Sequence, residues 1–274
     1  MPNSHRKASA RIRMVAIDLD GTLLTSTKKI TTQTADTLKA AAGTGVRIVI
    51  ASARPPRSVR AFYEQLGLDT LTINYNGALI WDERAKMPHT HLPMPPGLVR
   101  RIILFAREMF PEVLASCEVL DRWYTDRHDP AYTTETGRIF KPDLVAPMDD
   151  FLKEPVTKLM LLGDPAMITL LHGFVQGHFE QHCTAIRADP ELIQVMNPKA
   201  SKATAIKTVA DHYGIALEEV MAIGDAANDV PMLQTAGIAV AMDNAHPLVK
   251  EVADWVAPSN NDHGVAAAMS KFVL

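Results

Sequence analysis

The apolar residues of this chain follow two patterns. Apolar runs stand at 14–17 and 220–223, and a third at 46–50 is broken only by Arg47; such runs are typical of strands that are buried on both faces of a sheet. The segments 31–42 and 201–213 instead repeat apolar residues every three to four positions, which predicts amphipathic helices. Strands that alternate with helices pair in parallel through right-handed crossovers. The pattern therefore predicts an α/β fold with a doubly wound parallel sheet.

Further segments extend this pattern toward both ends of the chain. We expect additional strands at 71–73 and 238–241, and additional helices that start at Pro55 and cover 227–235 and 263–273. Glycines such as Gly43 and Gly67 stand where these helices are expected to end.

The middle of the chain differs in composition. Residues 83–195 are rich in proline, with strand patterns at 113–120, 156–162 and 191–196 and helix patterns at 97–109 and 165–178. We interpret 83–195 as an inserted α+β domain. The flanking segments, 1–82 and 196–274, then form one discontinuous α/β core.

Composition and charge exclude several classes of protein. The 274 residues are 47% hydrophobic and 22% charged, with a formal net charge of −3. These values are typical of a globular protein and give no basic excess of the kind that a dedicated nucleic-acid binder carries. No apolar run reaches the roughly 18 residues of a membrane span, and no secretory signal is expected from the basic N-terminal residues.

The number and spacing of the cysteines indicate the cellular compartment of the protein. Cys117 and Cys183 are the only cysteines and form no CxxC motif, so we expect reduced thiols. We predict a cytoplasmic protein without nucleic-acid or membrane partners. The sequence leaves open whether it is a monomer or a homo-oligomer.

Two aspartates follow the first predicted strand. Asp18 and Asp20 stand just before Gly21 and Thr22, at the sheet edge where open α/β folds bind ligands. Gly21 allows a sharp turn that brings both carboxylates to one site. One carboxylate can attack a phosphate to form an aspartyl-phosphate while the other acts as acid and base, and their proximity would raise the pKa of one of them. For this segment alone, a polar turn without chemistry is the alternative.

Two further polar residues lie where predicted helices begin. Ser52 follows the second strand, where its hydroxyl and nearby backbone N–H groups would hold a phosphate oxygen; capping the next helix is its alternative role. Lys202 begins the helix at 201–213, where its ammonium would neutralise a phosphate and steady a nucleophilic carboxylate. A solvated lysine is the alternative there.

A last acidic segment follows the strand at 220–223. Asp225 and Asp229 are four residues apart, on one side of a helical turn. The carboxylates of Asp18 and Asp225, with the backbone carbonyl of Asp20, suit Mg²⁺. Asp229 and Asn228 would either bind the metal as well or contact the residues that bind it. A capped helix start with acids near its positive end is the alternative.

These four segments, in this order, resemble the motifs of the haloacid dehalogenase superfamily. Ser52-Ala53-Arg54 departs from the usual Thr-Gly-Arg, although the hydroxyl is kept. The spacing of 150 positions from Ser52 to Lys202 places the insertion as in a type II (IIB) cap, and Asn76-Gly77-Ala78 resembles the Cof-type subgroup. The resemblance implies a Rossmann-like catalytic core and an inserted cap domain.

The resemblance also implies an activity. It indicates a Mg²⁺-dependent phosphatase for small phosphate monoesters such as sugar phosphates, with Asp18 as nucleophile and Asp20 as acid and base. The catalytic residues would be Asp18, Asp20, Ser52 and Lys202, and the metal ligands Asp18, Asp20, Asp225 and Asp229. The phosphate would be held by Leu19, Asp20, Ser52, Ala53, Lys202 and Asn228. A phosphomutase or phosphotransferase, or a non-catalytic phospho-acceptor module, are the alternatives.

Polar and aromatic residues are candidates for substrate contacts, although a surface or packing role is the simpler interpretation of each. They are Arg54 in the core and Trp123, Tyr124, Asp126, Arg127 and His128 in the predicted cap. Two histidine pairs, His178 with His182 and His89 with His91, have metal-like spacing but no third ligand at a convincing distance in the sequence.

Overall fold

The computed structural model describes residues 11–127, 129–132 and 134–274. The chain forms two compact units, one made of the residues up to His89 and from Ser201 onward, and one made of Thr90–Ala200. The boundaries expected at 82 and 195 fall earlier than these. At the first boundary the reason is a hairpin, because β4 (Leu79–Asp82) and β5 (Met87–His91) form one sheet with β3 (Thr72–Asn74).

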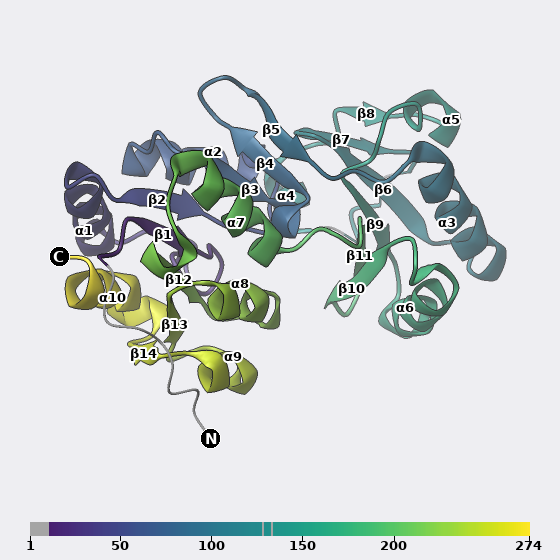
Figure 1. Ribbon diagram of the computed structural model, residues 1–274. Helices are drawn as coiled ribbons and strands as arrows, with labels where there is room; N and C mark the ends of the chain where they lie inside the picture. Colours follow the sequence, from purple (N-terminus) through teal and green to yellow (C-terminus); the bar gives the residue numbers. More distant parts are fainter. Residues whose placement is uncertain (1–10, 128, 133) are drawn as a thin grey trace. The chain divides into compact units, whose positions relative to one another are not determined.

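The first unit is built on a five-stranded sheet (Figure 1). Its order is β14 (Trp255–Ala257), β13 (Ile238–Met242), β12 (Val220–Gly224), β1 (Met14–Ile17) and β2 (Arg47–Ile50). All four pairings are parallel. Every residue of β1 is 0% exposed, so both faces of this strand are buried, and strands pair with both of its edges. This explains why its sequence is an apolar run rather than an alternation.

Helices cover this sheet in two groups. α1 (Thr32–Gly43) packs against α10 (Gly264–Phe272), and α7 (Lys202–Tyr213) packs against α8 (Val230–Thr235). The remaining helices are α2 (Pro56–Leu66) and α9 (Pro247–Val252). The predicted α/β class with a central parallel sheet is confirmed.

Three details of this unit differ from the sequence prediction. The strand at 71–73 joins the main sheet only through a single bridge, Ala51 to Ile73. The helix expected at 227–235 starts as a 3-10 turn (Ala227–Asp229) before α8. β4, β14 and α9 were not predicted, since they are only three to six residues long and show no clear period.

The second unit contains a six-stranded sheet. Its order is β10 (Thr184–Asp189), β11 (Leu192–Met196), β9 (Lys158–Leu162), β6 (Leu114–Val119), β7 (Arg122–Thr125) and β8 (Leu144–Val145). Its helices are α3 (Pro96–Met109), α4 (Glu135–Ile139), α5 (Met148–Phe151) and α6 (Pro165–Phe179). α3 and α6 pack on one face, against residues such as Cys117 and Leu161. The opposite face carries a smaller apolar cluster that includes Leu114 and Met160.

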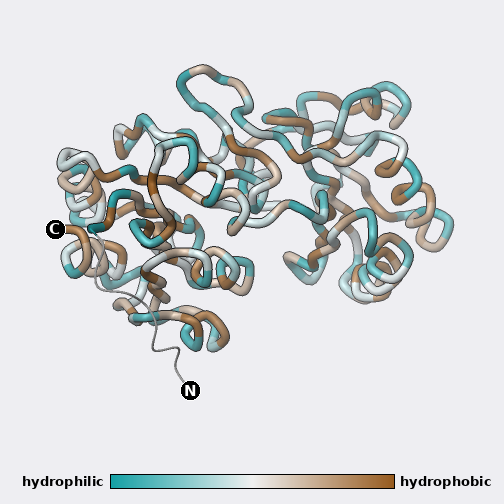
Figure 2. The backbone as a smooth tube through the Cα atoms, viewed as in Figure 1, coloured by the Kyte–Doolittle hydropathy of each residue, from teal (hydrophilic) through white to brown (hydrophobic). Residues whose placement is uncertain are grey.

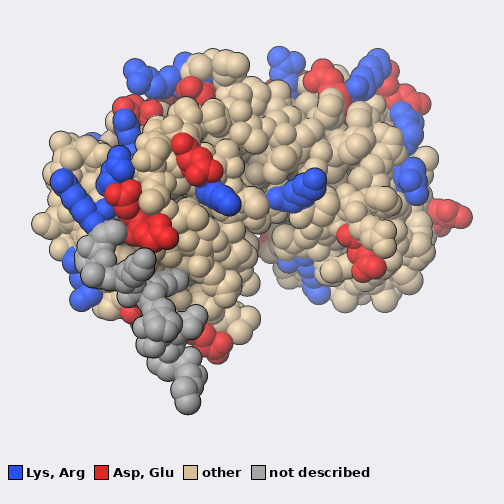
Figure 3. Space-filling model, in the orientation of Figure 1, with Lys and Arg blue, Asp and Glu red and all other residues tan. Residues whose placement is uncertain are grey.

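Hydropathy and charge follow this architecture. Figure 2 shows hydrophobic stretches inside both units, separated by hydrophilic ones. On the face drawn in Figure 3, basic and acidic side chains are intermixed. Within the described part of the chain, no helix has the length and apolar character to cross a membrane.

Candidate active site

Three candidate residues follow neighbouring strands of the first unit. Asp18 comes directly after β1, Asp225 directly after β12, and Ser52 two residues after the end of β2. Because these strands are parallel neighbours, their carboxyl ends meet at one edge of the sheet. Lys202 reaches the same place from the first turn of α7, whose N-cap is the side chain of Ser201. The fold thus brings together residues up to 207 positions apart.

A buried lysine links two of the carboxylates. The Nζ atom of Lys202 donates to Oδ1 of Asp18 and, at 2.6 Å, to Oδ1 of Asp229. The Lys202 and Asp229 side chains are 0% exposed, and that of Asp18 is 9% exposed. At such burial an unpaired charge would be costly, so the ammonium and its two partners depend on one another.

The site carries an excess of negative charge. Burial raises the pKa of Asp18 well above its ordinary value, and Asp229 adds to this effect, while Lys202 opposes it. Burial and Asp229 raise the pKa of Asp225 to about 6, against a hydrogen bond from Thr22. Burial alone would lower the pKa of Lys202, but Asp18 and Asp229 outweigh it and raise that pKa. The lysine therefore stays protonated, and the carboxylates favour a further cation.

Asp229 and Thr22 arrange the acidic group. Oδ2 of Asp229 accepts hydrogen bonds from the backbone N–H groups of Asp225 and Ala226, both at 3.0 Å. Since Oδ1 of Asp229 faces Lys202, both oxygens of this carboxylate are engaged. Oδ1 of Asp225 accepts from the hydroxyl of Thr22 at 2.6 Å. Asp229 thus fixes the turn that carries Asp225.

The acidic group fits a hard divalent cation. One carboxylate oxygen from each of Asp18, Asp225 and Asp229 lies within 4.8 Å of the others, and this is the only such group of potential ligands in the described residues. Oxygen donors of this kind suit Mg²⁺. Gly21 allows Asp225 to approach closely, because a Cβ atom at Gly21 would lie 2.3 Å from Oδ2 of Asp225.

Asp20 has a different environment from the one that the sequence predicts. Arg54 binds it through two hydrogen bonds, Nε to Oδ2 at 2.6 Å and Nη2 to Oδ1 at 2.5 Å. Lys28 donates to Oδ1 at 2.7 Å. Burial alone would raise the pKa of Asp20, but the hydrogen bonds from Arg54 and Lys28 lower it. Burial, with a contribution from Asp229, thus raises the pKa of Asp18 and Asp225, whereas the pKa of Asp20 is lowered.

Ser52 does not cap the next helix. α2 has Pro55 at its N-cap position and no side-chain cap. Ser52 is 1% exposed, and its Oγ accepts from the backbone N–H of Arg54 at 3.1 Å. The hydroxyl therefore shapes the loop that contains Ala53 and Arg54.

The other two predicted phosphate contacts also belong to this unit. The side chain of Leu19 is part of the apolar core, so only its backbone is available to a ligand. Asn228 donates from Nδ2 to Oδ1 of Asn76 at 2.9 Å.

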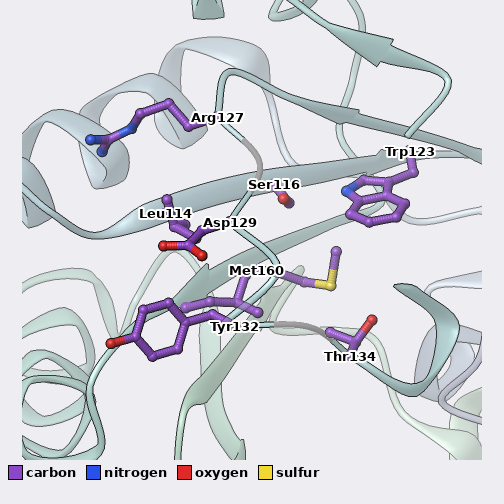
Figure 4. A pocket seen from close by; sticks show the side chains of 9 residues that line it. Leu114, Ser116, Trp123, Arg127, Asp129, Tyr132, Thr134 and Met160 are labelled. Atoms are coloured by element: carbon purple, nitrogen blue, oxygen red, sulfur yellow. The ribbon is translucent and has the colours of Figure 1, made fainter. Parts of the chain in front are cut away.

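The two aromatic candidates of the second unit, Trp123 and Tyr124, lie on opposite faces of its sheet. Trp123 lines a narrow pocket with Leu114, Ser116, Met160 and Tyr132 (Figure 4). Tyr124 packs on the other face of the sheet, where its ring centroid is 6.1 Å from that of Phe151, because successive residues of a strand point to opposite faces.

The polar candidates of this unit are engaged in its own structure. Arg127 also borders the pocket, but its guanidinium points away from Trp123 and donates to the carbonyl groups of Pro111 and Val113. Asp126 pairs with Arg107 at 2.6 Å. His128 lies outside the described residues.

The histidine pairs have other partners. Nδ1 of His178 lies 3.1 Å from the carbonyl oxygen of Phe174, and Nε2 of His91 lies 2.9 Å from Oγ1 of Thr157. His89 packs edge-on against His212 with centroids 4.6 Å apart.

Several residues of the site were missed by sequence reasoning. Thr22 and Asn76 were quoted only as parts of motifs, and Lys28 was not considered. Asn244, which donates to the carbonyl of Gly21 at 2.8 Å, also had no assigned role. The contacts of Thr22, Asn76 and Asn244 join distant segments, and their only signal in the sequence was their position in the motifs.

A parallel α/β sheet with a buried Asp–Lys–Asp contact beside a second carboxylate is the arrangement of a hydrolase that handles phosphate. The sequence profile of the haloacid dehalogenase-like hydrolases matches residues 15–269. The chain belongs to this family, as a Cof-type hydrolase, and is a phosphatase.

Known relatives share nearly the whole length of the chain. M6_Spy0533 of Streptococcus pyogenes, which bears a provisional phosphatase name, is 31% identical over 268 residues, with 96% of this chain and 99% of the relative covered. The 5-amino-6-(5-phospho-D-ribitylamino)uracil phosphatase YitU of Bacillus subtilis is 29% identical over 272 residues, with 94% and 97% covered.

A solved structure is similar as well. BT1666 of Bacteroides thetaiotaomicron, a phosphatase of the same superfamily, is 28% identical with a TM-score of 0.80, and the match covers 99% of this chain and 97% of BT1666.

Proposed function

We propose that the chain is a cytoplasmic, Mg²⁺-dependent enzyme that hydrolyses small phosphate monoesters, such as sugar phosphates, through an aspartyl-phosphate on Asp18. The observation that carries the proposal is the buried contact of Lys202 with both Asp18 and Asp229, beside Asp225. YitU, whose named substrate carries its phosphate on a ribityl chain, supports a small phosphorylated metabolite as substrate.

In the first step, an oxygen of Asp18 attacks the phosphorus atom and the bond to the leaving oxygen breaks. Asp20 gives a proton to that oxygen. Lys202 stabilises the charge on Asp18 and on the phosphate, while Ser52 and the backbone N–H groups near Leu19 and Ala53 hold phosphate oxygens.

In the second step, water attacks the aspartyl-phosphate. Asp20 takes a proton from the water, inorganic phosphate leaves, and Asp18 is restored. Arg54 and Lys28 favour the ionised form of Asp20, which is the form that this step requires. Because the first step requires a protonated Asp20, we expect its contacts with Arg54 and Lys28 to loosen when substrate binds.

The carboxylates of Asp18 and Asp225 and the backbone carbonyl of Asp20 would hold Mg²⁺. When bound, the ion supplies positive charge against the carboxylates and the substrate phosphate. Asp229, with both oxygens engaged, acts by fixing Lys202 and the turn of Asp225.

We assign the second unit to a cap domain that selects the leaving group. Within this unit, Trp123 is the candidate for substrate contact, because its ring borders a pocket. The contacts of Tyr124 and Arg127 give them structural roles.

Phosphate release from a panel of phosphorylated metabolites, with Mg²⁺ and with EDTA, tests the proposal. We expect release that requires the metal and is abolished in Asp18→Asn, while Asp36→Asn, an exposed change on α1, keeps full activity. Turnover in Asp18→Asn would refute the nucleophile. An isomerised product would indicate a mutase, and a long-lived aspartyl-phosphate without turnover would indicate a phospho-acceptor module.

A further inference from the structure

The turn that joins β3 to β4 has an unusual backbone. Tyr75, Asn76 and Gly77 have φ angles of 50°, 53° and 96°, so three successive residues adopt the left-handed region. Residues other than glycine rarely do so, and the conformation persists only where surrounding contacts hold it. Tyr75 is 0% exposed and Asn76 is 7% exposed, which means that the turn is buried and not a surface loop.

The backbone of this turn holds the loop of Ser52. The N–H of Asn76 donates to the carbonyl of Ser52 at 3.0 Å, and the N–H of Tyr75 donates to the carbonyl of Arg54 at 3.3 Å. Nδ2 of Asn74 also donates to the carbonyl of Arg54, at 3.1 Å. The conformation of the turn is thus tied to the position of the loop that carries Ser52 and Arg54.

The same turn contacts the other two functional segments. Oδ1 of Asn76 accepts from Nδ2 of Asn228, at 2.9 Å, in the turn that carries Asp225 and Asp229. Gly77 lies against the residue before Lys202, since a Cβ atom on Gly77 would be 2.2 Å from the carbonyl oxygen of Ser201. One turn therefore touches the segments of Ser52, Lys202 and Asp225.

We propose that Asn76 is a positioning residue for phosphate hydrolysis: its side chain fixes the amide of Asn228, while its left-handed backbone aligns the loop of Ser52 with the turn of Asp225. The inference rests on the proposed function. Asparagine suits this position because it tolerates the left-handed region better than most residues and offers an uncharged acceptor beside a phosphate site. Glycine would keep the backbone and lose the acceptor.

The substitution Asn76→Gly separates these two roles. It keeps the N–H that donates to Ser52 and removes only the side chain. We expect kcat to fall about 10- to 100-fold, the usual effect of removing a group that orients a metal-site or catalytic residue, with a Tm close to that of the parent. Lys86→Gly is the matched control, because Lys86 is also left-handed, at φ 54°, but its side chain is 54% exposed; its kcat should equal that of the parent.

A double-mutant cycle tests whether Asn76 acts through Asn228. If it does, Asn76→Gly has a much smaller effect on kcat in an Asn228→Ala background than in the parent. Equal effects in both backgrounds, or a parent-like kcat for Asn76→Gly, would overturn the inference. Failure of the proposed function is a separate result, since the parent chain itself would then release no phosphate.

Discussion

Replacement of Lys202 by methionine removes the ammonium from the centre of the site and keeps an apolar chain of similar length. In the native chain the ammonium is 0% exposed and contacts Asp18 and Asp229. The variant leaves these carboxylates, and Asp225 within 4.8 Å of them, without their buried counter-ion.

The expected loss of stability follows from this burial. Removing one partner of a buried ion pair costs about 3–5 kcal/mol. At about 2–4 °C per kcal/mol for a domain of this size, Tm should fall by about 6–20 °C. Lys207→Met is the control, because Lys207 is exposed on the same helix and its replacement should change stability by less than ~0.5 kcal/mol.

Thermal unfolding followed by circular dichroism, with and without Mg²⁺, measures this effect. We expect Mg²⁺ to raise the Tm of the parent chain and of Lys202→Met, because the ion offsets the charge of the carboxylates. Lys202→Met should still show no turnover, because the ion cannot replace the ammonium at Asp18. If Lys202→Met melted at the same temperature as Lys207→Met without metal, the ammonium would not be the counter-charge of this cluster and the reasoning would be refuted.

Two further predictions concern the metal. Gly21→Ala should weaken Mg²⁺ binding and turnover, because its Cβ would meet Asp225 and φ is +83° at this position. Gly43→Ala, with open space around it, is the control. Equal Mg²⁺ affinities of the two variants in calorimetric titration would contradict the prediction. Mg²⁺ affinity should fall as pH drops through about 6, because protons compete for Asp225. The raised pKa of Asp225 also makes the stability of the metal-free chain depend on pH. The contribution of Asp225 to the free energy of unfolding is favourable at low pH and is lost as pH rises through about 6. A pH-independent affinity between about pH 5 and 8 would contradict this assignment.

The sequence predicted those features of the fold that local patterns determine. β1 and β12 were recognisable because burial on both faces requires an apolar run, and Asp18 and Asp225 because they follow such runs. β7 was missed because Arg122–Thr125 is short and shows no alternation of apolar and polar residues. Without that strand, the sequence could not show that Trp123 and Tyr124 point to opposite faces.

The site was less predictable where partners come from distant segments. The sequence suggested that Asp20 would share the electrostatics of Asp18, since the two are adjacent in the motif. The pairing of Asp20 with Arg54 and Lys28 depends on how two loops fold around the strand edge, which no local pattern encodes. The role of Asn76 depends likewise on a residue 152 positions away.

The central position of β1 has a consequence for synthesis of the chain. β2, which pairs with one edge of β1, follows within about 30 residues, but Val220, the partner of Met14 on the other edge, is made 206 positions later. Until then an apolar edge of β1 has no strand beside it, and exposed apolar edges are prone to aggregate. Thr90–Ala200 is complete before β12 exists, whereas the nucleophile strand is enclosed only after β12 (Val220–Gly224) emerges. We therefore expect contacts of such long sequence separation to make the catalytic unit the slower of the two to fold.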